Sequence, residues 1–521
     1  MNLNFDNRFT QELPADALGV EHAHQARQVF NACWSATPPT PVSQPRLLAY
    51  AADVAESMGL SEQDVHSDAF VQVFSGNQLL AGMQPFSTCY GGHQFGHWAG
   101  QLGDGRAISL GEVVHEQQRF ELQLKGAGPT PYSRHADGRA VLRSSIREFL
   151  CSEAMHHLGV PSTRALSLIA TGDGVVRDMF YDGNAAVEQG AIVCRVAPSF
   201  IRFGHFEIFA QRGDVDTLKQ LVQFTMSRDF PELNGDMVAW FKEVCERTAI
   251  LVNHWLRVGF VHGVMNTDNM SIMGLTIDYG PYGWVDDLDF GWTPNTTDAG
   301  GKRYAFGRQA GVARWNLQKL AQALVDIMPS QKALIEGLAH FDATYQHTLE
   351  ATLANKLGLL DWTAADDALV DDLFQWMQKL EVDYTEFFRR LADVALNDGD
   401  NDALNRIMPA FYAASVLDVT ENRALVTQWL DAYQKRIAPQ NEPNANRRAR
   451  MNTFNPRFVL RNYLAQQAIE AAQAGDLSVL HELQSALLTP YDEVSEYQHL
   501  YGKRPEWARN KAGCSMLSCS S

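Results

Sequence analysis

One polar segment near the middle of the chain carries the residues best suited to chemistry. Asp268 and Asn269 stand side by side in it, and Asp278 follows after a short apolar run. A turn at Met273-Gly274 would fold the flanking apolar runs into a hairpin and place Asn269 opposite Asp278. Carboxylate and amide oxygens suit a hard divalent ion such as magnesium, which takes further ligands from phosphates. Asn269 and Asp278 are therefore predicted to bind a metal, and the alternative is that they only cap turns.

Asp268 precedes this pair by one residue and would point elsewhere. A carboxylate in that place can accept a proton from an attacking hydroxyl, which is the role of the catalytic-loop aspartate in protein kinases. We predict that Asp268 is a general base, with turn capping again as the alternative.

Closely spaced glycines form a second candidate site. Gly103 and Gly105, followed by Arg106, open onto a predicted strand. Such glycines let backbone N–H groups converge on an anion, and Lys125 at the end of the return strand adds a positive charge. A phosphate chain can be held in this way. A tight hairpin turn is the common alternative, and the GK[ST] ending and strand–loop–helix order of the usual nucleotide-binding motifs are absent from this segment.

Three more charged residues belong to this hypothesis. A lysine directed at phosphates must be oriented, and Glu148 in the interior of a predicted helix is suited to orient Lys125. Arg195 and Arg202 are seven residues apart, and Pro198 between them favours a loop from which both reach a phosphate. Each of these residues taken alone is more typical of solvated surface charge. The motif Tyr90–Gly96 suggests close packing and no chemistry that we can derive.

The elements that must position these residues fall into two kinds. Residues 70–203 are rich in glycine and short apolar runs, which indicates a sheet-rich region. Strands are expected over 107–114 and 119–125, since apolar and polar residues alternate in the second. A helix is expected from about Ser144 until Gly159.

Beyond His205 the pattern changes to long amphipathic helices. Residues 262–305 interrupt that pattern, and loops of such length in a compact domain tend to be functional. Residues 437–452, with two prolines and several asparagines, are expected to form a linker or exposed loop.

Composition excludes several classes of protein. Of the 521 residues 45% are hydrophobic and 20% charged, as in a globular chain. The formal net charge of -18 disfavours a general nucleic-acid binder or a binder of anionic membranes. Seven cysteines at irregular spacing indicate a reducing compartment. No signal peptide or membrane span is recognisable, so we expect a cytoplasmic protein.

The chain resembles the selenoprotein O family of kinase-fold protein adenylyltransferases over nearly its whole length. The strings that carry the resemblance are Tyr90 to Gly96, Leu102 to Arg106, Gln123 to Gly128, Pro131 to Arg134, Asp137 to Arg139, Leu142 to Ser145, His262 to Asn269, Asp278 to Gly280, Asn455-Pro456 and Arg461-Asn462. Several such strings in one order are far more specific than any one of them.

The resemblance implies an α+β, protein-kinase-like fold with two lobes. Residues 69–204 would form a sheet-rich N-lobe with the glycine loop, and residues 205–480 a mostly helical C-lobe with the catalytic and metal-binding loops. Residues 1–68 would be an N-terminal extension and 481–521 a C-terminal tail.

The resemblance also implies an activity. ATP would bind turned around relative to a kinase, so that AMP moves to a Ser, Thr or Tyr hydroxyl of a protein and pyrophosphate leaves. The implied roles are nucleotide binding by Gly103, Gly105, Arg106, Asp137 and Gly138, phosphate contact by Lys125 with Glu148 as its partner, phosphate binding by Arg195 and Arg202, general base catalysis by Asp268, and binding of Mg²⁺ or Mn²⁺ by Asn269 and Asp278.

The implied partners are other proteins, with the chain itself as a further substrate and UTP as a further donor. We expect a monomer with no nucleic-acid or membrane partner. Two alternatives stay open: a phosphotransferase that uses the same residues, and a non-catalytic nucleotide-binding scaffold. Eukaryotic relatives carry selenocysteine third from the end, where this chain has Cys519, and with Cys514 this thiol suggests redox control or an idle tail.

Overall fold

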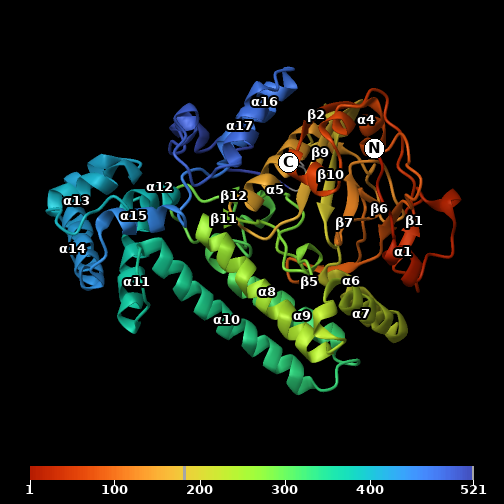
Figure 1. Ribbon diagram of the computed structural model, residues 1–521, viewed down its shortest axis with the longest axis horizontal. Coiled ribbons are helices and arrows are strands. Elements are labelled where there is room, and N and C mark those ends of the chain that lie inside the picture. The colour runs from red at the N-terminus through yellow and green to blue at the C-terminus, as the bar shows by residue number, and fades with distance from the viewer. Residues whose placement is uncertain (180–182, 519–521) are drawn as a thin grey trace.

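An antiparallel sheet occupies the N-terminal part of the molecule and helices make up most of the rest (Figure 1). The computed structural model describes residues 1–179 and 183–518. The strand order in the sheet is β1-β3-β6-β7-β10-β9-β2, with β8 paired to β10. The strands are β1 (Trp34–Ala36), β2 (Arg46–Tyr50), β3 (Phe86–Thr88), β6 (Ala107–His115), β7 (Gln118–Lys125), β8 (Ala140–Val141), β9 (Arg164–Arg177) and β10 (Ala186–Ala197).

Strands β6 and β7 confirm the two strands expected from the alternating pattern. They form a hairpin whose register pairs Ala107 with Lys125, so the end of the glycine loop lies beside the lysine. The apolar residues Ile108, Leu122 and Leu124 are buried, but the alternating polar residues Glu121, Gln123 and Lys125 are buried as well, so the strand is not exposed on one face.

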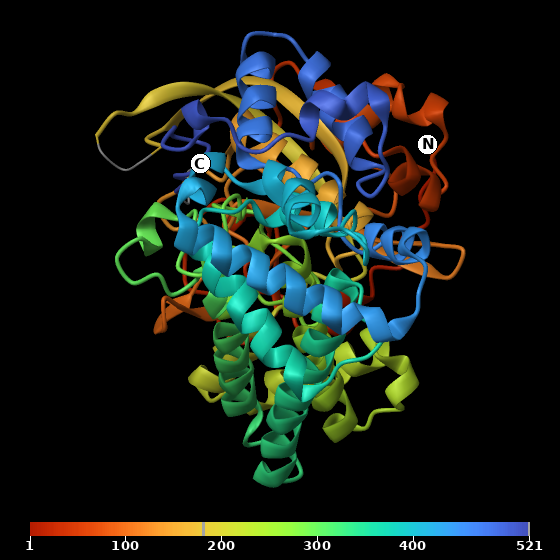
Figure 2. The same cartoon turned by 90° about the vertical axis from the view of Figure 1, so that its left-hand side faces the viewer.

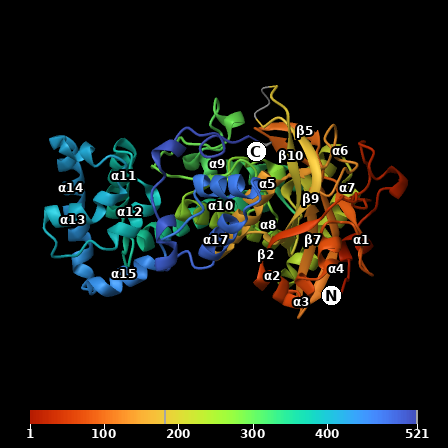
Figure 3. The same ribbon diagram turned by 90° about the horizontal axis from the view of Figure 1, so that it is seen from above.

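Helices cover both faces of this sheet (Figure 3). Helices α2 (Ala52–Ser57), α3 (Glu62–Val65) and α4 (Asp68–Phe74) share one apolar core with the face that carries Leu122 and Ile192. Helix α5 (Leu142–His157) packs on the opposite face, where Leu168 and Val193 are buried with it. As expected, α5 stops at Gly159, which adopts the left-handed conformation (φ 71°) that glycine tolerates best.

The remaining chain is mostly helical, and the irregular segment 262–305 interrupts it as the sequence pattern predicts; residues 488–518 are also irregular apart from two short 3-10 turns. The larger helices are α6 (Phe203–Arg212), α7 (Val215–Asp229), α8 (Met237–Val258), α9 (Gln309–Leu324), α10 (Gln331–Leu357), α11 (Ala364–Lys379), α12 (Tyr384–Leu391), α13 (Asp400–Ile407), α14 (Thr420–Ile437), α15 (Asn444–Asn452), α16 (Asn462–Gln473) and α17 (Ser478–Leu487). Helices α11 to α15 form the end farthest from the sheet, which faces the viewer in Figure 2. Among the described residues, none of the helices is both long and apolar enough for a membrane span.

Two expectations about loops are wrong. Residues 270–278 turn at Gly274, but the arms do not pair with each other, because Ser271 bridges to Arg202 and Thr276 to Ser162. The expected linker 437–452 instead contains α15, whose Arg447 is buried and donates to the hydroxyl of Tyr433 and the carbonyl of Val394.

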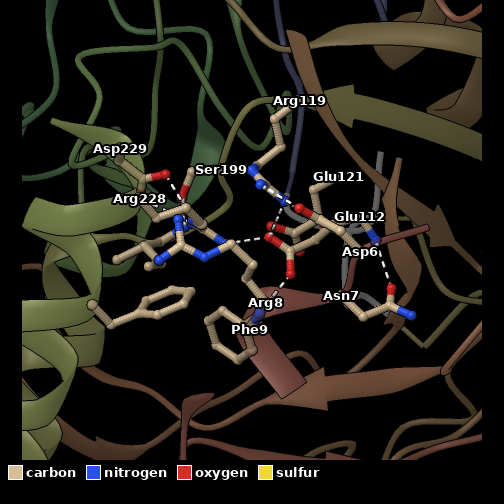
Figure 4. Close-up of polar contacts among 12 residues, drawn as sticks. Asp6, Asn7, Arg8, Phe9, Glu112, Arg119, Glu121, Ser199, Arg228 and Asp229 are labelled. Atoms are coloured by element: carbon tan, nitrogen blue, oxygen red, sulfur yellow. Dashed lines mark hydrogen bonds and ion pairs between the residues drawn. The ribbon is translucent and has the colours of Figure 1, made fainter. Parts of the chain in front are cut away.

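A buried ionic network ties the N-terminus and α7 to the sheet (Figure 4). Glu112 of β6 accepts hydrogen bonds from the Phe9 backbone N–H (2.5 Å) and from Arg228 of α7 (2.8 Å). Arg119 of β7 bonds both oxygens of Asp6, at 2.5 and 2.6 Å. The network therefore joins segments more than 100 residues apart in the sequence.

Candidate active site

A pocket of about 610 Å³ lies where the sheet meets the irregular segment. The predicted site residues that line it are Gly103, Gly105, Arg106, Lys125, Gly138, Arg195, Asp268, Asn269 and Asp278. Residues that are up to 175 positions apart in the chain are thus brought together around one cavity.

The glycine loop is shaped by the aromatic ring beneath it. A Cβ on Gly103, which has φ 72°, would lie 2.3 Å from the Tyr132 ring, and one on Gly105 would lie 2.9 Å from the Tyr132 carbonyl oxygen. The Asp104 side chain turns inward and accepts hydrogen bonds from the N–H and hydroxyl of Thr88, at 2.9 and 2.5 Å. With Asp104 turned inward, the loop leaves the pocket free of bulky side chains. The expected convergence of its backbone N–H groups on an anion is wrong, because those of Gly103, Asp104 and Gly105 donate to the carbonyl oxygens of Tyr90, Thr88 and Gly103.

Lys125, Glu148 and Arg195 form a buried charged group behind the pocket. The Lys125 Nζ lies 2.5 Å from Glu148 Oε2, and Arg195 Nη1 lies 3.3 Å from Glu148 Oε1. Burial lowers the pKa of Lys125 to about 8, although the Glu148 carboxylate opposes that shift. Glu148 of α5 therefore orients two cations that point toward the same cavity.

Asp278 lies between the two arginines. Arg195 donates to Oδ1 of Asp278 and Arg202 donates to Oδ2. Burial would raise the pKa of the Asp278 carboxyl, but Arg202, Arg195 and Lys125 outweigh it and hold that pKa well below its usual range. Arg202 also donates to the Asp268 carbonyl oxygen at 3.0 Å, which links the arginines to the neighbouring loop.

Asp268 has no cationic partner on its side-chain oxygens among the described residues, a property that it shares in this pocket with the inward-turned Asp104. It is 7% exposed, its Oδ2 accepts a hydrogen bond from Gln94 Nε2 (3.2 Å), and its buried Oδ1 has no partner. Burial raises the pKa of Asp268 to about 7, against the lowering effect of Gln94 and Arg202. A buried carboxylate with a free oxygen and a raised pKa has the properties of a general base.

These features coincide with a sequence match. A family model described as "Protein adenylyltransferase SelO" matches residues 16–488. The chain belongs to the SelO family. It is 57% identical over 525 residues to "Protein nucleotidyltransferase YdiU" of Methylobacillus flagellatus, a match that covers 100% of both chains. Proteins of the same name from Tolumonas auensis and an Azoarcus species are 57% and 58% identical, each over 100% of this chain and 99% of the relative.

The SelO-family chain is accordingly a nucleotidyltransferase that acts as a protein adenylyltransferase. This agrees with the function expected from the resemblance. It also requires a nucleotide as substrate, and Arg106, Lys125 and Arg195 are cations of the pocket lining suited to its phosphates.

The donor atoms fit a magnesium-type ion. Asn269 Nδ2 donates to the Val264 carbonyl oxygen at 2.8 Å, so its Oδ1 is left as a ligand, and both Asn269 and Asp278 line the pocket. No cluster of three or more His, Cys, Asp or Glu residues suited to a metal occurs in residues 1–179 and 183–518. Two oxygen ligands suit an ion that takes its other ligands from phosphates and water.

A short hairpin formed by the motif for which the sequence suggests close packing covers Asp268. Strands β4 (Gly91–Gln94) and β5 (His97–Gln101) form it, and a Cβ on Gly92 would lie 2.6 Å from Asp268 Oδ1. The His93 N–H donates to Thr267 Oγ1 at 2.7 Å. The paired glycines Gly91-Gly92 were the available signal, because backbone that must approach a side chain this closely requires glycine.

Three predicted residues lie behind or beside the pocket instead of lining it. Glu148 and Arg202 act on it through Lys125 and Asp278. Asp137 is half-exposed and its carboxylate lies 2.6 Å from Arg177. Of the tail, Cys514 is a free thiol whose pKa burial raises to about 11, and Cys519 lies outside the described residues.

Proposed function

We propose that the pocket binds ATP with its α-phosphorus toward Asp268 and transfers AMP to a Ser, Thr or Tyr hydroxyl of a protein. The observation that carries this proposal is the contrast inside one cavity between Asp268, whose Oδ1 is free, and Asp278, which two arginines bond. One carboxylate is thus suited to accept a proton and the other to neutralise charge or bind a cation.

In this proposal Asp268 takes the proton of the acceptor hydroxyl as its oxygen forms a bond to the α-phosphorus. The bond between that phosphorus and the oxygen bridging to the β-phosphate breaks, and pyrophosphate leaves with the electron pair. Arg195, Arg202 and Lys125 stabilise the charge that grows on the leaving group. Asn269 and Asp278 would hold Mg²⁺ or Mn²⁺, which shields the phosphate charges when bound.

The remaining predicted residues have supporting roles. Gly103, Gly105, Arg106 and Gly138 would contact the nucleotide from the pocket wall, and Glu148 would orient Lys125. Asp137 would reach the nucleotide only after it leaves Arg177.

We further infer that the fold is two-lobed and kinase-like, with the boundaries 1–68, 69–204, 205–480 and 481–521. The mixed architecture supports this, with its antiparallel sheet in the N-terminal part and helices beyond. A cytoplasmic monomer and UTP as a second donor stay predictions. Analytical ultracentrifugation and competition by UTP in the labelling assay would test them.

The decisive experiment compares ATP labelled on the α-phosphate with ATP labelled on the γ-phosphate. AMP transfer puts only the α-label on protein, whereas the alternative phosphotransferase would transfer the γ-label. The scaffold alternative predicts that Asp268→Ala changes no cellular phenotype. Our proposal predicts that Asp268→Ala loses transfer and keeps ATP binding, since Asp268 contacts no other predicted ligand through its carboxylate.

A further inference from the structure

The segment that leads into α9 has an unusual charge. Between Ala299 and Val325 the sequence contains five Lys or Arg residues and no Asp or Glu, in a chain whose net charge is -18. Part of this segment projects from the body of the molecule, green in Figure 2. A local positive surface on an acidic protein favours a negatively charged partner.

Most of these cations have no carboxylate partner. Among the ion pairs of the described residues, this stretch contributes only Arg314, whose Nε lies 2.8 Å from Asp342 Oδ1. Arg308 donates to the backbone carbonyls of Gly301 and Lys302, and Lys319 donates to the Gln322 amide at 3.0 Å. These acceptors are neutral, so neither side chain is paired with a carboxylate.

Two of the cations lie against the ring of Trp315. The Arg303 guanidinium lies 4.5 Å and the Lys319 Nζ 4.9 Å from the centre of its rings, within the range of cation–π attraction. The buried Nε of Arg303 has no hydrogen-bond partner. We call Arg303 and Lys319, which lie against Trp315, together with Lys302 and Arg308 of the same segment, the basic face.

The basic face adjoins the hairpin that covers the candidate base. The Trp315 ring centre lies 5.6 Å from that of His93, and Arg303 Nη1 would lie 3.5 Å from a Cβ on Gly96. Gln94 of the same hairpin donates to Asp268. A chain segment lying on the basic face would therefore be close to the place where the acceptor hydroxyl must arrive.

We propose that the basic face docks an acidic segment of the protein substrate, so that a hydroxyl flanked by Asp or Glu residues reaches Asp268. This inference rests on the proposed function. Carboxylates placed at Arg303 and Lys319 compensate two cations that otherwise repel each other across Trp315. A short acidic segment senses mainly the local charge, since salt screens charges beyond about 10 Å. A long nucleic acid would also meet the net negative charge of the whole chain.

The test uses synthetic peptides with one Ser, Thr or Tyr acceptor flanked either by Asp and Glu or by the neutral Asn and Gln. Label from α-labelled ATP is measured on each peptide with the full-length enzyme. We expect kcat/KM about tenfold higher for the acidic peptide, mainly through KM, and a difference that shrinks with added salt. Equal rates at low salt for both peptides would overturn the inference.

Charge-reversed variants locate the effect. Arg303→Glu combined with Lys319→Glu should abolish the preference for acidic peptides and favour a Lys-flanked peptide, while KM for ATP stays unchanged. Lys435→Glu on α14, which is 74% exposed and pairs with Asp431, is the matched control and should keep the preference. If the double variant does not fold, Lys319→Gln alone takes its place, since it leaves the Arg303 contacts intact. It should lower the preference for acidic peptides at least twofold.

Two further outcomes separate the hypotheses. If the wild type labels neither the peptides nor itself, the proposed function fails and this inference fails with it. If labelling occurs without charge preference, only this inference fails. The same assay also tests nucleic acid as the partner. If an oligonucleotide competes with the acidic peptide more strongly than an unlabelled acidic peptide does, the basic face binds nucleic acid and the inference is overturned.

Discussion

Asp278 and Asp268 lie in the same pocket and have opposite electrostatic surroundings. Two arginines bond Asp278, whereas the Asp268 carboxylate receives a single hydrogen bond from an amide. Cations near a carboxylate favour its charged form and burial favours its neutral form, so the two pKa values diverge. Such divergence would let one pocket supply both the proposed metal ligand and the proposed base.

This contrast predicts different losses for two substitutions. Asp278→Ala should abolish metal-dependent ATP binding, because it would remove a proposed metal ligand and the carboxylate that holds Arg195 and Arg202 in place. Asp268→Ala should keep ATP binding and lose transfer by about 10²-fold or more. Isothermal titration with ATP and Mg²⁺ measures the first and α-label transfer the second. Unchanged titration of Asp278→Ala would contradict the metal role.

Gly92 gives a third residue-level prediction. A methyl group there would come 2.6 Å from Asp268 Oδ1, so Gly92→Ala should displace the carboxylate and lower transfer by about 10²-fold, since small misplacements of catalytic groups are costly. ATP binding should persist. Gly502→Ala, where a Cβ meets nothing within 4 Å, is the control. A Gly92→Ala enzyme with wild-type rates would show that the hairpin does not position the base.

At the level of elements, the sequence predicts those strands and helices whose apolar residues recur with a regular period. Strands β6 and β7 and helix α5 were expected, because alternating or helical apolar patterns reflect a face that is buried. The prediction of a hairpin at 270–278 was wrong, because the two arms pair with Arg202 and Ser162 instead of with each other. No local sequence pattern reveals such distant pairing. Helix α15 was missed because its stability comes from buried contacts of Arg447 with distant residues.

The residues of the candidate site also differ in whether a local sequence pattern could reveal them. Chemistry-bearing residues such as Lys125, Asp268 and Asp278 were recognisable from type and order. The roles of Gly92 and Gln94 were not, since the contact between Gln94 and Asp268 spans 174 residues. Their positions depend on how the β4–β5 hairpin docks on the catalytic loop, which tertiary packing alone decides.

Two helical glycines test packing between elements. Gly337 of α10 is buried against α8, where a Cβ would lie 2.5 Å from the Phe241 ring. Gly337→Ala should destabilise the protein by about 1–3 kcal/mol, because Phe241 is fully buried and has no room to move. Gly311→Ala on α9 meets nothing within 4 Å and should stabilise by about 0.5–1 kcal/mol. The Tm of each variant, measured by thermal unfolding, tests both predictions. A Tm that shifts in the same direction in both variants would contradict the packing argument.

At the scale of the whole molecule, the ionic network at the N-terminus joins parts that are remote in sequence (Figure 4). Arg228 of α7 bonds Glu112 of β6 and Ser199 in the loop before α6, at 2.8 and 2.7 Å. Glu121 of β7 accepts from the Ser109 hydroxyl at 2.8 Å and the Phe200 N–H at 3.2 Å. The helices after the sheet are therefore attached to it through buried charges as well as apolar contacts.

Glu121 makes the stability of this attachment dependent on pH. Burial, with the nearby Glu112 carboxylate, raises the pKa of Glu121 to about 7, and Arg228 opposes the shift. In the unfolded chain the pKa is the ordinary 4.5, so the folded protein holds an extra proton between about pH 4.5 and 7. Glu121 therefore favours the folded state most below pH 4.5, and its contribution to the free energy of unfolding is lost as the pH rises through 7.

Glu121→Gln removes this titration. Its amide oxygen can still accept from the Phe200 N–H, and its NH2 group can donate to the Ser109 hydroxyl oxygen. The difference in stability between the variant and the wild type should therefore move in favour of the variant from pH 5 to pH 8, by on the order of 2–3 kcal/mol. Taking the difference between the two proteins cancels the contributions of groups that the substitution leaves unchanged. Urea unfolding at the two pH values measures it. Parallel pH profiles would show that Glu121 stays charged in the folded protein and that Arg228 dominates its environment.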